Sequence, residues 1–71
     1  MASWSQDVFS TMASSISYDS DSGTMIVTYN TGRSYAYANV PEDVATEAAN
    51  ASSVGDYINE NIKGRYSFRR L

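Results

Sequence analysis

Two strand-like segments joined by a short glycine-containing connection constrain the fold most. Residues 24–29 (TMIVTY) are rich in β-branched side chains, which is typical of a strand. Residues 30–32 (NTG) form a three-residue connection with its glycine placed for a left-handed bulge, and residues 33–38 then alternate. With residues 14–18 as a further strand, closed by the turn DSDSG at 19–23, the pattern predicts a three-stranded antiparallel meander.

Two helices are predicted after the meander. Pro41 suits the first turn of a helix over residues 41–49, because two acidic residues follow it near the positive end of the helix dipole. Residues 53–63 carry apolar side chains at helical spacing, and Gly64 is typical of the position just beyond a helix end. Residues 65–68 alternate again, which fits either a short strand or an ordered tail.

A further short helix is predicted at the N-terminus. Ser3 and Gln6 match a capping box. One apolar stripe follows at helical spacing with a phenylalanine beside it, and its members are Trp4, Val8, Met12 and Phe9. The predicted fold is therefore α+β: a three-stranded antiparallel meander packed against two C-terminal helices, with residues 1–13 as an N-terminal helical extension of a domain at 14–71.

The composition limits both stability and chemistry. A chain of 71 residues forms one domain with a small core, and this one contains no cysteine and no histidine. Disulfides, thiol catalysis, Ser-His-Asp catalysis and histidine-ligated metals are therefore excluded. Small scaffolds often oligomerise instead, so we expect a homo-oligomer with the N-terminal stripe as a contact surface. Without cysteine, a signal peptide or a long apolar run, a cytoplasmic location is expected.

Paired carboxylates occur twice, at Asp19/Asp21 and at Glu42/Asp43. The first pair fits a turn and the second fits a helix start, so neither pair is expected to be catalytic. The acidic turn begins like a calcium loop, but its twelfth position, which requires glutamate, is Asn30. We therefore predict a protein that is not an enzyme and that uses no metal or other cofactor.

An aromatic strand and a basic tail form the candidate ligand site. Tyr35 and Tyr37 share one face of the predicted strand, and Arg33 lies at odd spacing on the same face. Such rings can stack on bases while arginine binds phosphate; alternatively, the tyrosines are core residues with their hydroxyls at the rim.

The charge is divided unequally along the chain. Residues 1–62 contain all eight acidic residues and one basic residue, whereas residues 63–71 contain four basic residues, so charges of −7 and +4 sum to −3. Lys63, Arg65 and Tyr66 in this tail could complete the site, or they could be an ordinary solvated chain end.

Several short motifs occur in an order that resembles the KTSC domain, named for its place at the C-terminus of some lysyl-tRNA synthetases. Besides Tyr18, they are NTG at 30–32, YAY at 35–37, VP at 40–41, ASSVG at 51–55 and IKGRY at 62–66. The resemblance implies a compact α+β domain that often stands alone in bacterial and phage proteins. It also implies possible RNA binding, which has been proposed for the family.

Two functions remain open. The first is a nucleotide-binding protein that sequesters a small phosphorylated ligand between subunits, similar in size and residue types to the phage anti-defence sponges that trap cyclic nucleotide signals. It would act in the bacterial host cell. The second is an RNA-binding or protein-interaction module. One basic cluster on an acidic body can neutralise one or two phosphates, but not the row of phosphates along an RNA backbone. The charge distribution therefore favours the first function over RNA binding.

Overall fold

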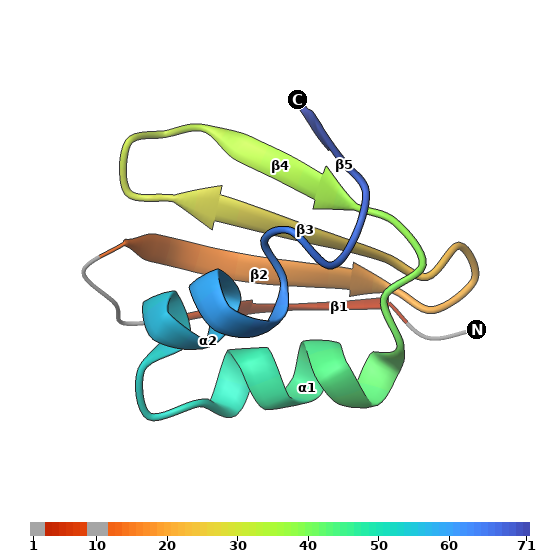
Figure 1. Cartoon of the computed structure of the whole chain (residues 1–71), viewed down its shortest axis with the longest axis horizontal. Helices are drawn as coiled ribbons and strands as arrows, with labels where there is room; N and C mark the ends of the chain where they lie inside the picture. Colours follow the sequence, from red (N-terminus) through yellow and green to blue (C-terminus); the bar gives the residue numbers. More distant parts are fainter. Residues whose placement is uncertain (1–2, 9–11) are drawn as a thin grey trace.

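The structure, a computed structural model, describes residues 3–8 and 12–71. It contains a five-stranded antiparallel sheet whose strands follow one another in chain order, with two helices on one face (Figure 1). The strands are β1 (Ser3–Asp7), β2 (Ala13–Asp19), β3 (Thr24–Tyr29), β4 (Ser34–Tyr37) and β5 (Phe68–Arg70). Helices α1 (Glu42–Asn50) and α2 (Val54–Asn61) lie between β4 and β5 in the chain.

The two central hairpins close through glycines in the left-handed region. Gly23 has a φ of 68° and Gly32 a φ of 90°, and other residues rarely adopt these values. At the second turn, the Tyr29 amide donates to the Arg33 carbonyl over 2.8 Å. This bond continues the β3–β4 ladder to the end of the hairpin, so Tyr29 and Arg33 lie opposite each other.

The core lies between the sheet and the helices. Alternate residues of β2 and β3 are buried on the helix-covered face, and the opposite face carries mainly serine and threonine. Helix α1 contributes three alanines, whose small size lets it approach the sheet closely. The largest fully buried side chains are Ile16, Met25, Ile58, Ile62, Val27 and Val40.

The predicted fold is wrong in its strand count and at its N-terminus. Residues Ser3–Asp7 form β1, antiparallel to β2, where a helix was expected, and β5 adds the fifth strand. Trp4 packs against Tyr18 with ring centroids 5.9 Å apart, and Val8 is buried, so the predicted helical contact stripe does not exist. Its fourth member, Phe9, lies outside the described residues.

A spacing of four residues explains the error at β1. Trp4 and Val8 lie on one face of a helix, but an even spacing also places them on one face of a strand. The strand is selected by its partners: it pairs with β2 over five residues, and the Gln6 side chain donates to the Ala49 carbonyl of α1 over 3.2 Å.

Within residues 3–8 and 12–71, no helix combines the length and apolar character needed to cross a membrane.

Candidate functional site

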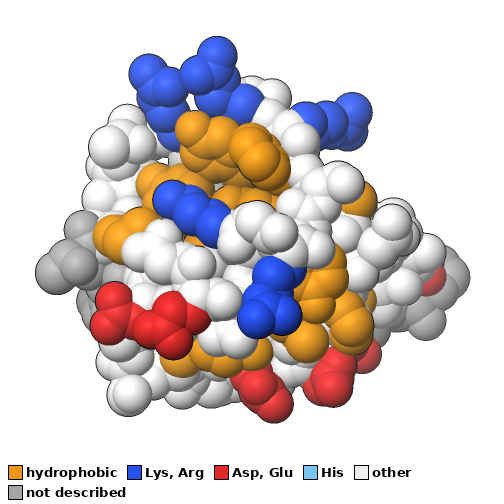
Figure 2. Space-filling view, viewed as in Figure 1, with side chains coloured by type: hydrophobic (Ala, Val, Ile, Leu, Met, Phe, Trp, Pro, Cys, Tyr) orange, Lys and Arg blue, Asp and Glu red, His pale blue; other side chains and the backbone are white. Residues whose placement is uncertain are grey.

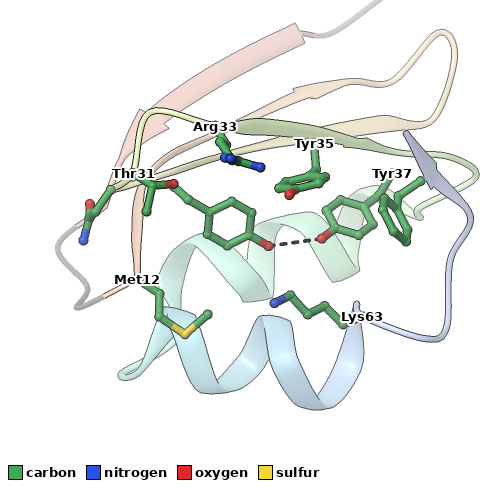
Figure 3. A pocket seen from close by; sticks show the side chains of 9 residues that line it. Met12, Thr31, Arg33, Tyr35, Tyr37 and Lys63 are labelled. Atoms are coloured by element: carbon green, nitrogen blue, oxygen red, sulfur yellow. Dashed lines mark hydrogen bonds between the residues drawn. The ribbon is translucent and has the colours of Figure 1, made fainter. Parts of the chain in front are cut away.

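A pocket of about 580 Å³ opens on the helix-covered face of the sheet, between the β3–β4 hairpin, β5 and the segment that follows α2 (Figure 3). Its lining residues come from four separate parts of the chain, so the pocket exists only in the folded protein. They are Met12, Tyr29, Asn30, Thr31, Arg33, Tyr35, Tyr37, Lys63 and Phe68.

Four of the nine described lining residues are aromatic, and strand register brings their rings together. Tyr35 and Tyr37 pair with Val27 and Met25, so both point to the helix-covered face, and Phe68 of β5 pairs with Tyr37. The ring of Tyr35 meets Phe68 edge-on at 5.7 Å between centroids, a favourable aromatic geometry. It meets the Tyr29 ring similarly at 5.4 Å.

Exposure increases along this wall, from Tyr37 at 2% through a half-buried Tyr35 to Phe68 at 60%. Tyr37 is therefore a core residue that also lines the inner end of the pocket, while Phe68 stands at its mouth. The interpretation of Tyr37 as a core residue is confirmed, and its role in ligand binding stays a prediction.

A buried pair of hydroxyls lies at the inner end. The hydroxyls of Tyr29 and Tyr37 are 3.1 Å apart and share one hydrogen bond. Burial, assisted by this bond, raises the pKa of Tyr29 well above its ordinary value. Tyr29 therefore stays neutral at physiological pH and adds no negative charge to the pocket.

Two cations face the pocket from different elements. Arg33 comes from the β3–β4 turn and Lys63 from the segment after α2, and Figure 3 shows them on opposite sides of the aromatic rings. The Lys63 ammonium lies 5.5 Å from the centroid of the Tyr29 ring, in cation–π contact. None of the residues described as lining the pocket is acidic, so its charge is positive.

The positive pocket belongs to a wider separation of charge. In the view of Figure 2, most of the basic side chains lie in the upper part, whereas the acidic side chains lie along the lower part.

The structure brings four of the six predicted site residues together: Arg33, Tyr35, Tyr37 and Lys63. Arg65 and Tyr66 do not line the pocket. Gly64, with a φ of 80°, turns the chain after Lys63, so the exposed Arg65 donates to the Glu60 carbonyl over 3.4 Å and Tyr66 packs against the core.

Sequence reasoning missed the other five lining residues: Met12, Tyr29, Asn30, Thr31 and Phe68. Tyr29 was detectable, because it continues the alternation of Met25 and Val27 and ends the strand opposite Arg33. Phe68 was not, because only its pairing with β4 across the chain brings it to the pocket.

Comparisons with known proteins identify the family. The model of the KTSC domain matches residues 9–66. A crystal structure of a KTSC domain protein from Yersinia pestis is similar at a TM-score of 0.88 and 31% identity, covering 99% of each chain. Two lysine–tRNA ligases, from Nostoc punctiforme and Trichormus variabilis, are 34% and 35% identical over 78% and 76% of this chain. The chain spans only 10% of the length of these ligases. The protein therefore belongs to the KTSC family.

Proposed function

We propose that this KTSC protein binds a small nucleotide in the aromatic pocket and holds it without turnover. The observation that carries the proposal is the composition of the pocket wall: four aromatic rings and two cations, with no carboxylate among the described lining residues. Aromatic rings bind the faces of bases, and arginine and lysine side chains bind phosphate.

The arrangement offers a phosphate one cation on each side of the aromatic rings, Arg33 on one side and Lys63 on the other. Neither side chain has a carboxylate partner among residues 3–8 and 12–71, so no ion pair must break before a ligand binds. The volume of about 580 Å³ lies in the range typical of small-molecule sites. The half-buried Tyr35 and the exposed Phe68 are the aromatic residues that a base would contact at the mouth of the pocket.

Sequestration between subunits is part of the proposal. Phe68 at the mouth is exposed in the single chain, so a second copy could cover a ligand that one chain leaves open. A sponge of this kind would trap a cyclic nucleotide signal in the bacterial host cell. Sedimentation with and without ligand tests this step, and a monomer at micromolar concentration in both states would contradict it.

The direct experiment is calorimetric titration with cyclic mono- and dinucleotides, after mass spectrometry of any small molecule that co-purifies. Arg33→Ala and Lys63→Ala each remove one charge-assisted contact, so each should weaken binding by about tenfold to a hundredfold. Tyr35→Ala removes a stacking ring and should weaken nucleotide binding by a similar factor. Arg65→Ala is the matched control, because it removes an equal charge just outside the pocket.

Equal effects of Arg65→Ala and Lys63→Ala would contradict a defined pocket and indicate only a general attraction between charges. Failure of every nucleotide to bind the folded protein would contradict the proposal itself.

RNA binding is the second candidate function. It is supported by the similarity to part of two lysine–tRNA ligases, proteins whose substrate is an RNA. Single-stranded RNA would also use stacking rings with cations beside them. The salt dependence separates the candidates: RNA binding that contacts several phosphates falls steeply with salt, whereas a mononucleotide contacting two cations responds weakly.

A further inference from the structure

We propose that the free edge of β5 binds an extended acidic segment of a partner protein by strand addition. Strand addition at this edge does not depend on the pocket function. The surface consists of the outer backbone edge of Phe68–Arg70 and the side chains that flank it, of which Phe68 also lines the mouth of the pocket. No other described strand pairs with this edge, because β5 is the last strand in the sheet order.

The hydrogen-bond pattern shows which backbone groups are available. The Ala38 amide donates to the Ser67 carbonyl, and the Leu71 amide donates to the Ser34 carbonyl, both over 2.9 Å. Since hydrogen-bonded pairs alternate along an antiparallel ladder, Arg69 also directs its amide and carbonyl toward β4. Phe68 and Arg70 therefore direct theirs to the free edge, where an added strand would pair with them.

The side chains beside this edge define the partner. Phe68 and Leu71 are 60% and 61% exposed, and they are the exposed large hydrophobic side chains of the described chain. Arg70 shares the helix-covered face with its pairing partner Tyr35, whereas Arg69 lies with Ala36 on the opposite face. Both arginines are exposed and have no ion-pair partner among residues 3–8 and 12–71.

An added strand consequently meets a positive charge on each face and an apolar side chain beside each charge. An antiparallel segment matches this edge if its successive residues are apolar, acidic, acidic and apolar, opposite Leu71, Arg70, Arg69 and Phe68. The two arginines also disfavour pairing of β5 with β5 of a second copy of the chain, because the two strands side by side would bring like charges together. Pairing of β5 with β1 of another copy would be a head-to-tail contact that need not close.

The first test uses a fluorescein-labelled peptide with the core Val-Glu-Glu-Val between Gly-Ser flanks, and measures its binding by fluorescence anisotropy. Methylation of the first Glu nitrogen removes a donor that faces β5, so binding should fall about tenfold or more. Methylation of the second Glu nitrogen, which points away from β5, should leave binding nearly unchanged. Equal effects of the two methylations, or no binding of the unmodified peptide, would overturn the proposal.

The second test changes the protein. Arg70→Ala and Arg70→Pro remove the same charge, but only the proline removes the outward amide, so binding should fall about two- to fivefold in the first and further in the second. The β4 ladder does not use the Arg70 amide, and circular dichroism checks that both variants fold. Equal binding by the two variants, or binding that depends on Lys63 and not on residue 70, would overturn strand addition.

Discussion

Tyr29 and Tyr37 show how one contact between two residues serves both the core and the pocket. Their hydroxyls bond to each other at the inner end of the pocket and both side chains are buried, at 8% and 2% exposure. A buried hydroxyl without a partner is costly, so each residue satisfies the other.

Tyr37→Phe should lower the free energy of unfolding by about 1–3 kcal/mol, because it leaves the Tyr29 hydroxyl buried and unpaired. The double variant Tyr29→Phe/Tyr37→Phe should recover most of this loss, since neither hydroxyl then remains. Urea unfolding followed by circular dichroism measures both. Tyr66→Phe is the control, and its free energy of unfolding should lie within about 0.5 kcal/mol of that of the original chain. A double variant as unstable as the sum of the two single variants would contradict this account.

The site was predictable as far as local alternation reaches. The alternation of side chains along a strand was enough to predict that Arg33, Tyr35 and Tyr37 share one face. The structure brings all three to the pocket. The remainder depends on contacts between distant segments. Lys63 and Arg65 look equivalent in sequence, but the turn at Gly64 directs only Lys63 to the pocket.

At the scale of elements, hydrogen bonding to neighbouring segments decides whether a segment forms a helix or a strand where its hydrophobic spacing fits both. The hairpin residues were predicted correctly because β-branched side chains and well-placed glycines specify them locally. The ends of the sheet were not, because β1 resembles a short helix in its spacing and β5 has only three residues. Both strands are stabilised by a neighbouring strand, and a single sequence does not reveal that neighbour.

Gln6 illustrates this tertiary control, and its removal is testable. Its side-chain amide donates to the Ala49 carbonyl, one of the last carbonyls of α1, which have no acceptor role within the helix. Gln6→Ala should therefore lower the free energy of unfolding by about 0.5–1.5 kcal/mol.

Ser5→Ala is the matched control for this variant, because Ser5 is exposed on the same strand and points to the opposite face. Thermal unfolding of the two variants gives the comparison. An unchanged midpoint for Gln6→Ala, or an equal loss in both, would show that this bond does not hold β1 to α1.

At the scale of the whole molecule, charge and burial are arranged together. The helices cover one face of the sheet, and the pocket opens on that covered face with no acidic residue among its described lining (Figure 3). The core contains tyrosines in place of charged residues: Tyr18, for example, is 4% exposed and donates to the Val40 carbonyl over 2.6 Å. Ionisation of such buried phenols therefore opposes the folded state.

Alkaline pH should consequently unfold the protein as its buried tyrosines ionise. Burial is the main cause that raises the pKa of Tyr18, Tyr29 and Tyr57 above the ordinary 10.0, so above pH 10 the folded chain binds more protons than the unfolded chain. The stability that these groups provide is fully present below pH 10 and decreases as the pH rises above it. Titration should follow tyrosinate absorbance and circular dichroism together. Part of the tyrosinate absorbance should therefore appear only as the secondary structure is lost. Ionisation of all six tyrosines in one step near pH 10, with the circular dichroism unchanged, would contradict the burial of these hydroxyls.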